Sequence, residues 1–236
     1  MMRVFILAGG LGTRIFPFST VVPKPLLPVA GVPCVRWIVE TLLEQGFTDI
    51  YLCINKSSES NFKHEFRDLK VKFSVTEGPM GTAGELLHAK KYIKGDFLLV
   101  YGDDLTEINY AEMVEFHKKY KAKATLAVTT GFTLPVGVVT FNWIDNNVYG
   151  EVESFREKPC LTQFVWTGSA ILPKQIVKYL ENYQDIAYFV IPKLIEEGGV
   201  HAYIIDKPWW DVGNIENWRA VNEYFRQKNK KRGIKK

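Results

Sequence analysis

Strand-like and helix-like patterns alternate through the first half of the chain, and this alternation most limits the folds available to it. Short apolar runs are typical of buried strands, and apolar residues at helical spacing lie between them. Strands are expected at Val4–Leu7, Ile50–Ile54, Val71–Val75 and Phe97–Tyr101, with helices after Pro33 and at Glu59–Leu69, Ala83–Ile93 and Tyr110–Tyr120. Such a repeat predicts an α/β fold with a parallel sheet and helices on both faces.

The second half of the chain has a different pattern. We expect strands at Ala124–Thr130, Val136–Phe141, Val148–Phe155 and Val165–Leu172, helices around Gln175–Asn182 and Phe189–Glu197, short strands at His201–Ile205 and Trp209–Val212, and a closing helix at Asn214–Gln227. No low-complexity linker separates the halves. We therefore predict one domain over residues 1–227, in which the strands after about residue 130 extend the sheet and close a substrate pocket.

Composition excludes several classes of protein. No apolar run approaches the roughly 20 residues that span a membrane, and the three cysteines form no CxxC pair, so neither a zinc site nor a disulfide framework is indicated. A reducing cytoplasm is the expected compartment. The net charge of +4 comes from residues 228–236, which hold six of the 30 Lys and Arg residues and no acid. We interpret this basic tail as a frayed terminus rather than a nucleic-acid or membrane contact.

The run Val4–Leu7 leads directly into a turn that contains Gly9, Gly10 and Gly12. Glycine lets the backbone turn tightly and approach a ligand, and the exposed amides of such a turn can cradle phosphate oxygens. The turn matches neither the P-loop spacing nor G-x-G-x-x-G, because Ile15 stands where the last glycine would be. A plain strand-to-loop turn is the alternative.

Two cations follow this turn and favour anion binding. Arg14 offers a planar fork and Lys24 a mobile point charge. Pro23 and Pro25 hold Lys24 on a stiff segment that could aim it. Together with the glycines they predict a site for a polyphosphate, whereas the alternative is a solvated lysine in a proline-rich loop.

Acidic residues stand where two further strands end. Asp103 follows the apolar run Phe97–Tyr101, and Asp211 follows a tryptophan pair. Ligands of open α/β sheets bind beyond the carboxyl ends of the strands, and Mg²⁺ takes one or two protein carboxylates and shares phosphate oxygens. We expect these two acids to hold one Mg²⁺, with Asp104 facing away. The alternatives are that Asp103 only caps the next segment and that Asp211 is only a turn residue.

A third charged cluster, Phe155–Pro159, ends a strand of the second half. Lys158 could bind a phosphate, and Glu157 could accept hydrogen bonds from hydroxyls, although such pairs are also common surface residues. The chain has no G-x-S-x-G elbow and no Ser/His or Cys/His pair in its sequence pattern.

These motifs, in this order, resemble those of the sugar-1-phosphate nucleotidylyltransferases. The resemblance spans residues 7–213 and rests on Leu7–Arg14, Pro23–Leu26, Pro28–Gly31, Gly78–Gly84, Gly102–Asp103, Gly137–Val139, Glu157–Pro159 and Trp210–Gly213. It implies a Rossmann-like three-layer α/β/α fold with a mixed, mainly parallel sheet. It also implies that a sugar 1-phosphate attacks the α-phosphorus of a nucleoside triphosphate (NTP) and expels pyrophosphate. Many relatives carry a C-terminal β-helix, and this chain is predicted to lack one.

The resemblance also implies roles for single residues. The catalytic group comprises Arg14, Lys24, Asp103 and Lys158, and the metal ligands for Mg²⁺ are Asp103 and Asp211. Nucleotide binding falls to Leu7, Ala8, Gly9, Gly10, Gly12, Thr13, Glu77, Gly81 and Thr82, and sugar-phosphate binding to Gly137, Glu157, Lys158, Thr167 and Gly168. Trp166 replaces an asparagine that many members have before Thr167–Gly168, so the identity of the sugar is the open point of this set.

Glu77 bears on the choice of nucleotide. An ionised carboxylate only accepts hydrogen bonds, and guanine presents two adjacent donors, so a glutamate at the base edge favours GTP. The segment from Glu77 to Gly84 most resembles the mannose-1-phosphate guanylyltransferase branch of the family, and this resemblance implies mannose 1-phosphate as the partner of GTP. If Glu77 only caps the following turn, this argument fails, and glucose 1-phosphate with UTP or dTTP is the alternative. A non-catalytic regulatory subunit is a further alternative. A homo-oligomer is left open, because exposed aromatics in such folds often form dimer contacts.

Overall fold

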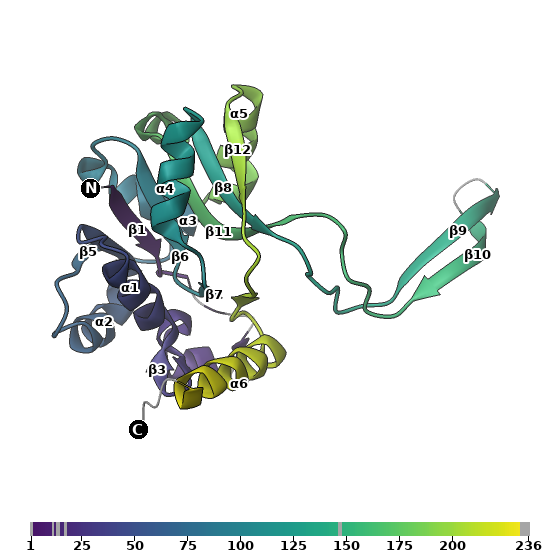
Figure 1. Ribbon diagram of the computed structural model, residues 1–236, viewed down its shortest axis with the longest axis horizontal. Helices are drawn as coiled ribbons and strands as arrows, with labels where there is room; N and C mark the ends of the chain where they lie inside the picture. The colour runs from purple at the N-terminus through teal and green to yellow at the C-terminus, as the bar shows by residue number, and fades with distance from the viewer. Residues whose placement is uncertain (1, 11, 13–14, 17, 146–147, 232–236) are drawn as a thin grey trace.

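The central feature of the structure is a seven-stranded sheet with the order β12-β8-β11-β6-β1-β4-β5. The computed structural model describes residues 2–10, 12, 15–16, 18–145 and 148–231. Within the sheet, β11 runs antiparallel to both of its neighbours, while all other neighbouring pairs are parallel. The predicted mixed, mainly parallel sheet is therefore confirmed (Figure 1).

The sheet strands are β1 Arg3–Leu7, β4 Ile50–Asn55, β5 Lys72–Thr76, β6 Phe97–Tyr101, β8 Ala124–Thr129, β11 Val165–Leu172 and β12 Val200–Ile204. The helices are α1 Cys34–Glu44, α2 Glu59–Glu65, α3 Gly81–His88, α4 Tyr110–Lys119, α5 Ile191–Glu196 and α6 Ile215–Lys231. Three small pairs complete the strands: β2 Pro28–Val29 with β3 Val32–Pro33, β7 Asp104–Thr106 with β13 Trp209–Asp211, and β9 Val138–Asp145 with β10 Tyr149–Arg156.

Alternate residues of the central strands feed two separate cores. Val4 and Ile6 of β1 join the core beneath α1, α2, α4 and α6, whereas Phe5 and Leu7 face the core beneath α3 and α5. Successive side chains of a strand point to opposite faces, and a strand covered on both faces therefore reads as one continuous apolar run. The three-layer α/β/α arrangement is confirmed.

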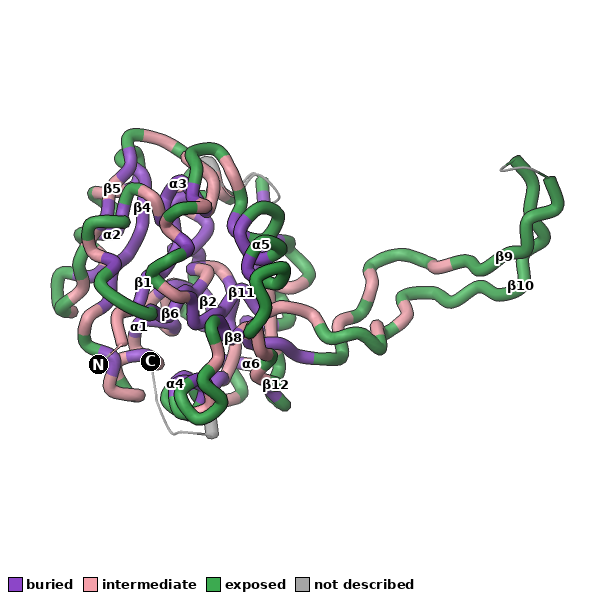
Figure 2. Tube along the Cα trace, turned by 90° about the horizontal axis from the view of Figure 1, so that it is seen from above, coloured by how far each residue is buried: buried purple, intermediate pink, exposed green. Residues whose placement is uncertain are grey.

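One prediction about the second half is wrong. β8, β11 and β12 extend the sheet as expected, but β9 and β10 pair only with each other. They form a two-stranded ribbon that projects away from the body, and Figure 2 shows it exposed along almost its whole length. In this chain the ribbon does not close a pocket over the sheet. Strand-like alternation indicates that a segment pairs, but it does not say which strand it pairs with.

Several helix lengths also differ from expectation. Glu59–Leu69 ends as a helix at Glu65, and Ala83–Ile93 divides into α3 and the 3₁₀ turn Lys90–Tyr92. The segment expected as a helix at Gln175–Asn182 is the 3₁₀ helix Lys174–Tyr179. α6 continues to Lys231, so the start of the predicted frayed tail is helical. In the part of the chain that the structure describes, no helix is both long and apolar enough to cross a membrane.

Candidate active site

The glycine turn and Asp103 lie side by side because β1 and β6 are parallel neighbours. Leu7 is paired with Tyr101 at the carboxyl ends of these strands, and the Gly102 amide donates to the Leu7 carbonyl at 2.8 Å. A pocket opens at this edge of the sheet. It is lined by Leu7, Ala8, Gly10, Gly12, Lys24, Pro25, Thr82, Glu85, Tyr101 and Asp103. The structure thus brings together a large part of the predicted nucleotide site.

Lys24 is the central cation of this pocket. Its Nζ pairs with the Asp103 carboxylate and lies 3.1 Å from Asp211 Oδ1. Asp211 lies on β13, near the C-terminal end of the chain, and β13 pairs antiparallel with β7. The Val212 amide also donates to the Asp103 carbonyl at 3.0 Å. The two acids predicted to share a metal ion therefore converge, with the lysine ammonium between them.

Burial and charge act in opposite directions on Lys24, which is only 6% exposed. Burial by itself lowers the pKa of an ammonium group, but the negative charges of Asp103 and Asp211 outweigh it and leave the Lys24 pKa above its ordinary value. Lys24 is consequently charged at neutral pH. A buried, positively charged lysine beside the glycine turn can bind anions that approach over that turn.

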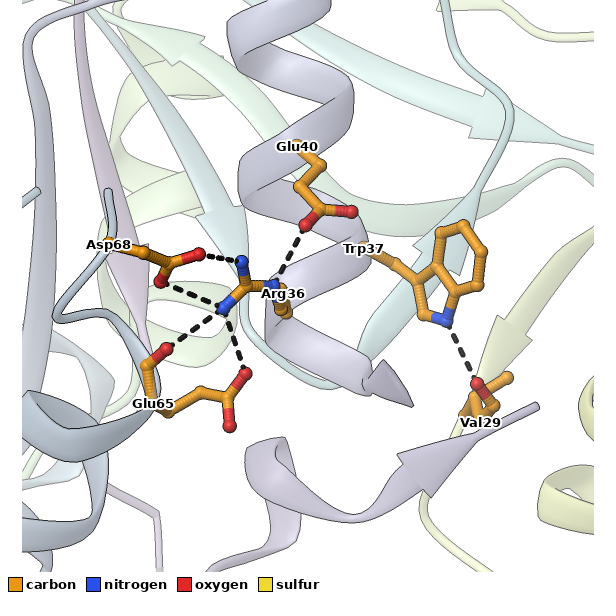
Figure 3. A network of polar contacts seen from close by, with 6 residues as sticks. All are labelled: Val29, Arg36, Trp37, Glu40, Glu65 and Asp68. Carbon is orange, nitrogen blue, oxygen red and sulfur yellow. Dashed lines mark hydrogen bonds and ion pairs between the residues drawn. The ribbon is translucent and has the colours of Figure 1, made fainter. Parts of the chain in front are cut away.

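The segment that carries Lys24 is held from three sides. Gly12 adopts φ +65°, and a Cβ there would stand 2.7 Å from Lys24 Cβ, so only glycine lets the turn lie against this lysine. From α1, Trp37 Nε1 donates to the Val29 carbonyl at 2.9 Å (Figure 3). From α6, Trp218 Nε1 donates to the Pro28 carbonyl at 2.9 Å. These contacts fix the backbone on which Lys24 is mounted.

α1 is itself tied to α2 by an arginine. Arg36 Nε donates to Glu40 at 2.8 Å, and its Nη1 donates to the Glu65 carbonyl at 2.9 Å (Figure 3). The Asp68 carboxylate receives both Nη groups in a forked pair. The Arg36 network therefore steadies the helix that positions the Lys24 segment.

Glu85 is a site residue that the sequence analysis missed. It is 3% exposed, and its carboxylate oxygen Oε2 accepts from the Gly9 amide at 3.2 Å. Burial raises the pKa of Glu85 to about 8, so the group is mostly protonated at neutral pH. The signal that could have found it is its position in α3, between the buried Gly84 and Leu86. An acid inside an apolar stretch is a candidate for function.

Asp104 does not hold the same position as Asp103. Its side chain is buried against Gly168, which has φ +73° and leaves no room for a Cβ beside the carboxylate. Burial, reinforced by the charge of Asp103, raises the pKa of Asp104 well above its ordinary value. Glycine at position 168 therefore leaves the space that the Asp104 carboxylate occupies.

Two further predicted nucleotide residues, Gly81 and Thr82, lie at the start of α3. Thr82 lines the pocket, donates from Oγ1 to Asp185 Oδ1 at 3.1 Å and accepts from the Ile186 amide at 2.8 Å. Gly81 begins the helix, whereas Glu77 is exposed in the bend after β5. Its contact with a base stays a prediction. Thr13 and Arg14 lie outside the described residues.

The predicted sugar-phosphate residues are divided between two places. Thr167 is fully buried, and its Oγ1 donates to the Ala127 carbonyl at 3.0 Å, so this hydroxyl is engaged in the sheet. Gly137, Glu157 and Lys158 lie at the start of the projecting ribbon, where a Cβ on Gly137 would stand 3.0 Å from Glu157 Oε2. These three are exposed and do not line the pocket around Lys24.

Asp103 and Asp211 are the candidate protein ligands for a metal ion. The described residues contain no cluster of three or more His, Cys, Asp and Glu side chains that could hold a metal alone. Two converging carboxylates with a cation between them suit a hard divalent ion that takes its other ligands from water and phosphate. These residues therefore fit a metal that arrives with a nucleotide better than a permanent protein cage.

The family model for nucleotidyl transferases matches residues 3–228. The mannose-1-phosphate guanyltransferase 2 of Candida glabrata is 31% identical over 96% of this chain, and the mannose-1-phosphate guanyltransferase of Aspergillus oryzae is 30% identical over 92% of it. The chain spans 65% and 62% of the length of these two relatives.

A solved structure supports the same assignment. The crystal structure of HddC from Yersinia pseudotuberculosis complexed with GMP-PN superposes with a TM-score of 0.75 and 26% identity, and the match covers 95% of this chain and all of HddC. The family match extends over both strands that end at the pocket and over the segments with Lys24, Asp103 and Asp211. The chain therefore belongs to the nucleotidyl transferase family.

Proposed function

We propose that this protein is a sugar-1-phosphate nucleotidylyltransferase, which makes a nucleotide sugar and pyrophosphate from a nucleoside triphosphate and a sugar 1-phosphate. The observation that carries the proposal is the buried Lys24 held between Asp103 and Asp211 beside the glycine turn, in a chain whose family match covers residues 3–228. This arrangement favours phosphate chemistry over a purely structural ion pair, because the glycine turn and Asp103 follow neighbouring parallel strands, and Lys24 and Asp103 both line the pocket at that edge.

The reaction needs positioning and charge neutralisation more than a protein nucleophile. A phosphate oxygen of the sugar 1-phosphate attacks the α-phosphorus in line, the bond to the β-phosphate oxygen breaks, and pyrophosphate leaves with its electron pair. Lys24 would neutralise negative charge that grows on the phosphates, and the amides of the glycine turn would orient the nucleotide. Arg14 is proposed to bind the same phosphates.

We propose Mg²⁺ as the metal, with Asp103 and Asp211 as its protein ligands. When bound, such an ion neutralises phosphate charge and orients the triphosphate. Lys24 would then exchange its carboxylate partners for phosphate oxygens, since its long side chain can move while its backbone stays fixed.

GTP and mannose 1-phosphate are the proposed substrates. Support comes from the names of the curated relatives, from HddC complexed with GMP-PN, and from the exposed Glu77 beyond β5. The cytoplasm is the proposed compartment, because the buried Cys34 and Cys53 are free thiols.

A substrate matrix tests the proposal. Pyrophosphate release is measured for five nucleoside triphosphates, each with several sugar 1-phosphates and Mg²⁺, and GTP with mannose 1-phosphate should give the fastest release. The absence of release in every combination would refute the enzyme. A preference for UTP that persists in Glu77→Gln would refute the role of Glu77 in choosing guanine.

A further inference from the structure

The arm, defined here as residues 130–164, has an apolar face that nothing in this chain covers. The arm leaves the sheet after β8 and returns to it at β11, and its ribbon of β9 and β10 projects far from the body (Figure 1). Its root is ordered: Phe132 packs on Trp209 at a ring distance of 6.0 Å, and the Leu134 amide donates to the Pro159 carbonyl at 3.0 Å. The base of the arm is therefore held in place by contacts with the body and between its own two segments.

The two faces of the ribbon differ in chemistry. On one face the cross-strand pairs are Val139 with Phe155 and Phe141 with Val152, and Trp143 packs edge-on against Phe141 at 4.7 Å. These five side chains are between 42% and 63% exposed. The opposite face carries hydrogen-bonded polar pairs, such as Thr140 with Ser154 at 2.6 Å and Asn142 with Glu153 at 2.5 Å. A ribbon that is apolar on one side only is typical of a sheet packed on a partner.

The exposed area is too large for a ribbon that stays in water. The arm exposes ten large apolar side chains: Val136, Val139, Phe141, Trp143, Ile144, Val148, Tyr149, Val152, Phe155 and Phe164. Since an aromatic side chain alone offers about 150–250 Å², the arm leaves on the order of 1,000 Å² of apolar surface exposed. Five of these side chains form the apolar face described above and the others are spread along the arm. An isolated two-stranded hairpin is only marginally stable, so a ribbon with this much apolar exposure needs a surface to pack on.

We infer that the arm is exchanged between two copies of this chain, so that the apolar face of each arm is buried on the other copy. Each copy carries the same arm, so a twofold arrangement covers both at once and buries on the order of 2,000 Å² or more, which is the size of a stable dimer interface. The paired connecting segments direct the ribbon away from its own body, which favours the second copy over a return to the same chain.

The charges of the residues that line the pocket also favour a second copy of this chain as the partner of the arm. Among the described lining residues the cation is Lys24, and it is already matched by the two carboxylates of Asp103 and Asp211. Arg14 and Mg²⁺ are already proposed to neutralise the triphosphate, so the phosphate of the sugar 1-phosphate needs a further cation, and the arm bears Arg156 and Lys158 at the end of its ribbon nearest the body. This step rests on the proposed function: the second copy supplies Glu157 and Lys158 to the sugar-phosphate half of the site.

The size of the protein in solution tests the packing. Light scattering should give a dimer for the unaltered chain, and Phe141→Asp on the apolar face should shift it to a monomer. Thr140→Asp, its neighbour on the polar face of the same strand, should leave the dimer intact, which controls for damage to the ribbon. A monomeric unaltered chain, or a dimer that Phe141→Asp leaves unchanged, overturns the exchange. This readout does not depend on any enzymatic activity.

Mixing two inactive variants tests whether the arm acts on the other copy. Asp103→Ala impairs the body and Lys158→Ala impairs the arm, so each alone should release little pyrophosphate. Coexpressed with different tags and purified as a mixture, they should recover about one quarter of the unaltered activity, because half of the dimers are mixed and one of their two sites is complete. No recovery in a verified mixed dimer overturns delivery in trans. An inactive unaltered protein would refute the proposed function instead, while the light-scattering result stands.

Discussion

The pocket around Lys24 and the ribbon of β9 and β10 are two parts of one proposed site, and they are built in opposite ways. At the pocket, Lys24 is buried and its segment is held by Trp37 and Trp218. On the ribbon, Glu157 and Lys158 are exposed, and the strands pair only with each other. We therefore propose that phosphate binding is assembled within one chain, whereas the sugar-phosphate half depends on a ribbon whose two strands pair only with each other.

The largest expected effect is at Lys24. Lys24→Ala removes the buried cation and leaves Asp103 and Asp211 facing each other, so pyrophosphate release should fall by about 10³-fold and the free energy of unfolding by about 2 kcal/mol. Both are measured, by a coupled phosphate assay and by urea unfolding. Lys56→Ala, which breaks an exposed pair with Glu59, is the matched control and should cost less than about 0.5 kcal/mol. Unchanged activity in Lys24→Ala would remove this residue from the mechanism.

A lysine-to-alanine substitution at the ribbon should lower activity without lowering stability. Lys158→Ala should lower kcat/KM by about 10²-fold, mainly by raising KM for the sugar 1-phosphate, because it removes one phosphate contact. Its melting temperature should not change, since Lys158 is exposed. A loss of stability as large as that of Lys24→Ala would mean that the two regions are not built differently.

Glu85 should make the stability of the pocket region depend on pH. Its pKa in the folded chain is about 8, against an ordinary value of 4.5, so the folded state holds the proton more tightly. Stability from this group is then complete below about pH 4.5 and is lost as the pH rises through 8, by about 5 kcal/mol in total. Glu85→Gln should flatten this part of the unfolding free-energy curve, measured with urea from pH 5 to 9. A slope that persists in Glu85→Gln would show that another group carries it.

The smallest expected difference is in the destabilisation caused by alanine at two glycines, Gly12 and Gly131. Gly12→Ala meets Lys24 Cβ and an unfavourable φ, so it should destabilise the protein by about 2–3 kcal/mol and slow pyrophosphate release. Gly131 at the root of the arm has φ +83° with open space around it. Gly131→Ala should cost only about 1 kcal/mol, from the backbone alone. Equal effects of the two substitutions, read by thermal unfolding, would argue against close packing of the turn on Lys24.

The sequence predicted which residues meet at the Lys24 pocket better than it predicted the position of the ribbon, for a physical reason. Apolar runs such as Val4–Leu7 and Phe97–Tyr101 place the residues that follow them at one edge of a parallel sheet, so the glycine turn and Asp103 could be expected to meet. The motif around Glu157 carries no such information, because strand alternation does not specify a pairing partner. Glu85 could not be assigned a role, since its burial under Gly9 depends on how α3 packs on β1.

The most direct test of the account is to locate the metal in a crystal grown with Mn²⁺ and a non-hydrolysable GTP analogue. Mn²⁺ replaces Mg²⁺ at oxygen ligands and can be identified by its anomalous scattering. We predict one strong peak within coordination distance of Asp103 and Asp211, with the nucleotide phosphates over the glycine turn and Lys24 Nζ moved onto a phosphate oxygen. A bound nucleotide whose Mn²⁺ lies away from both carboxylates, with Lys24 still between them, would contradict it.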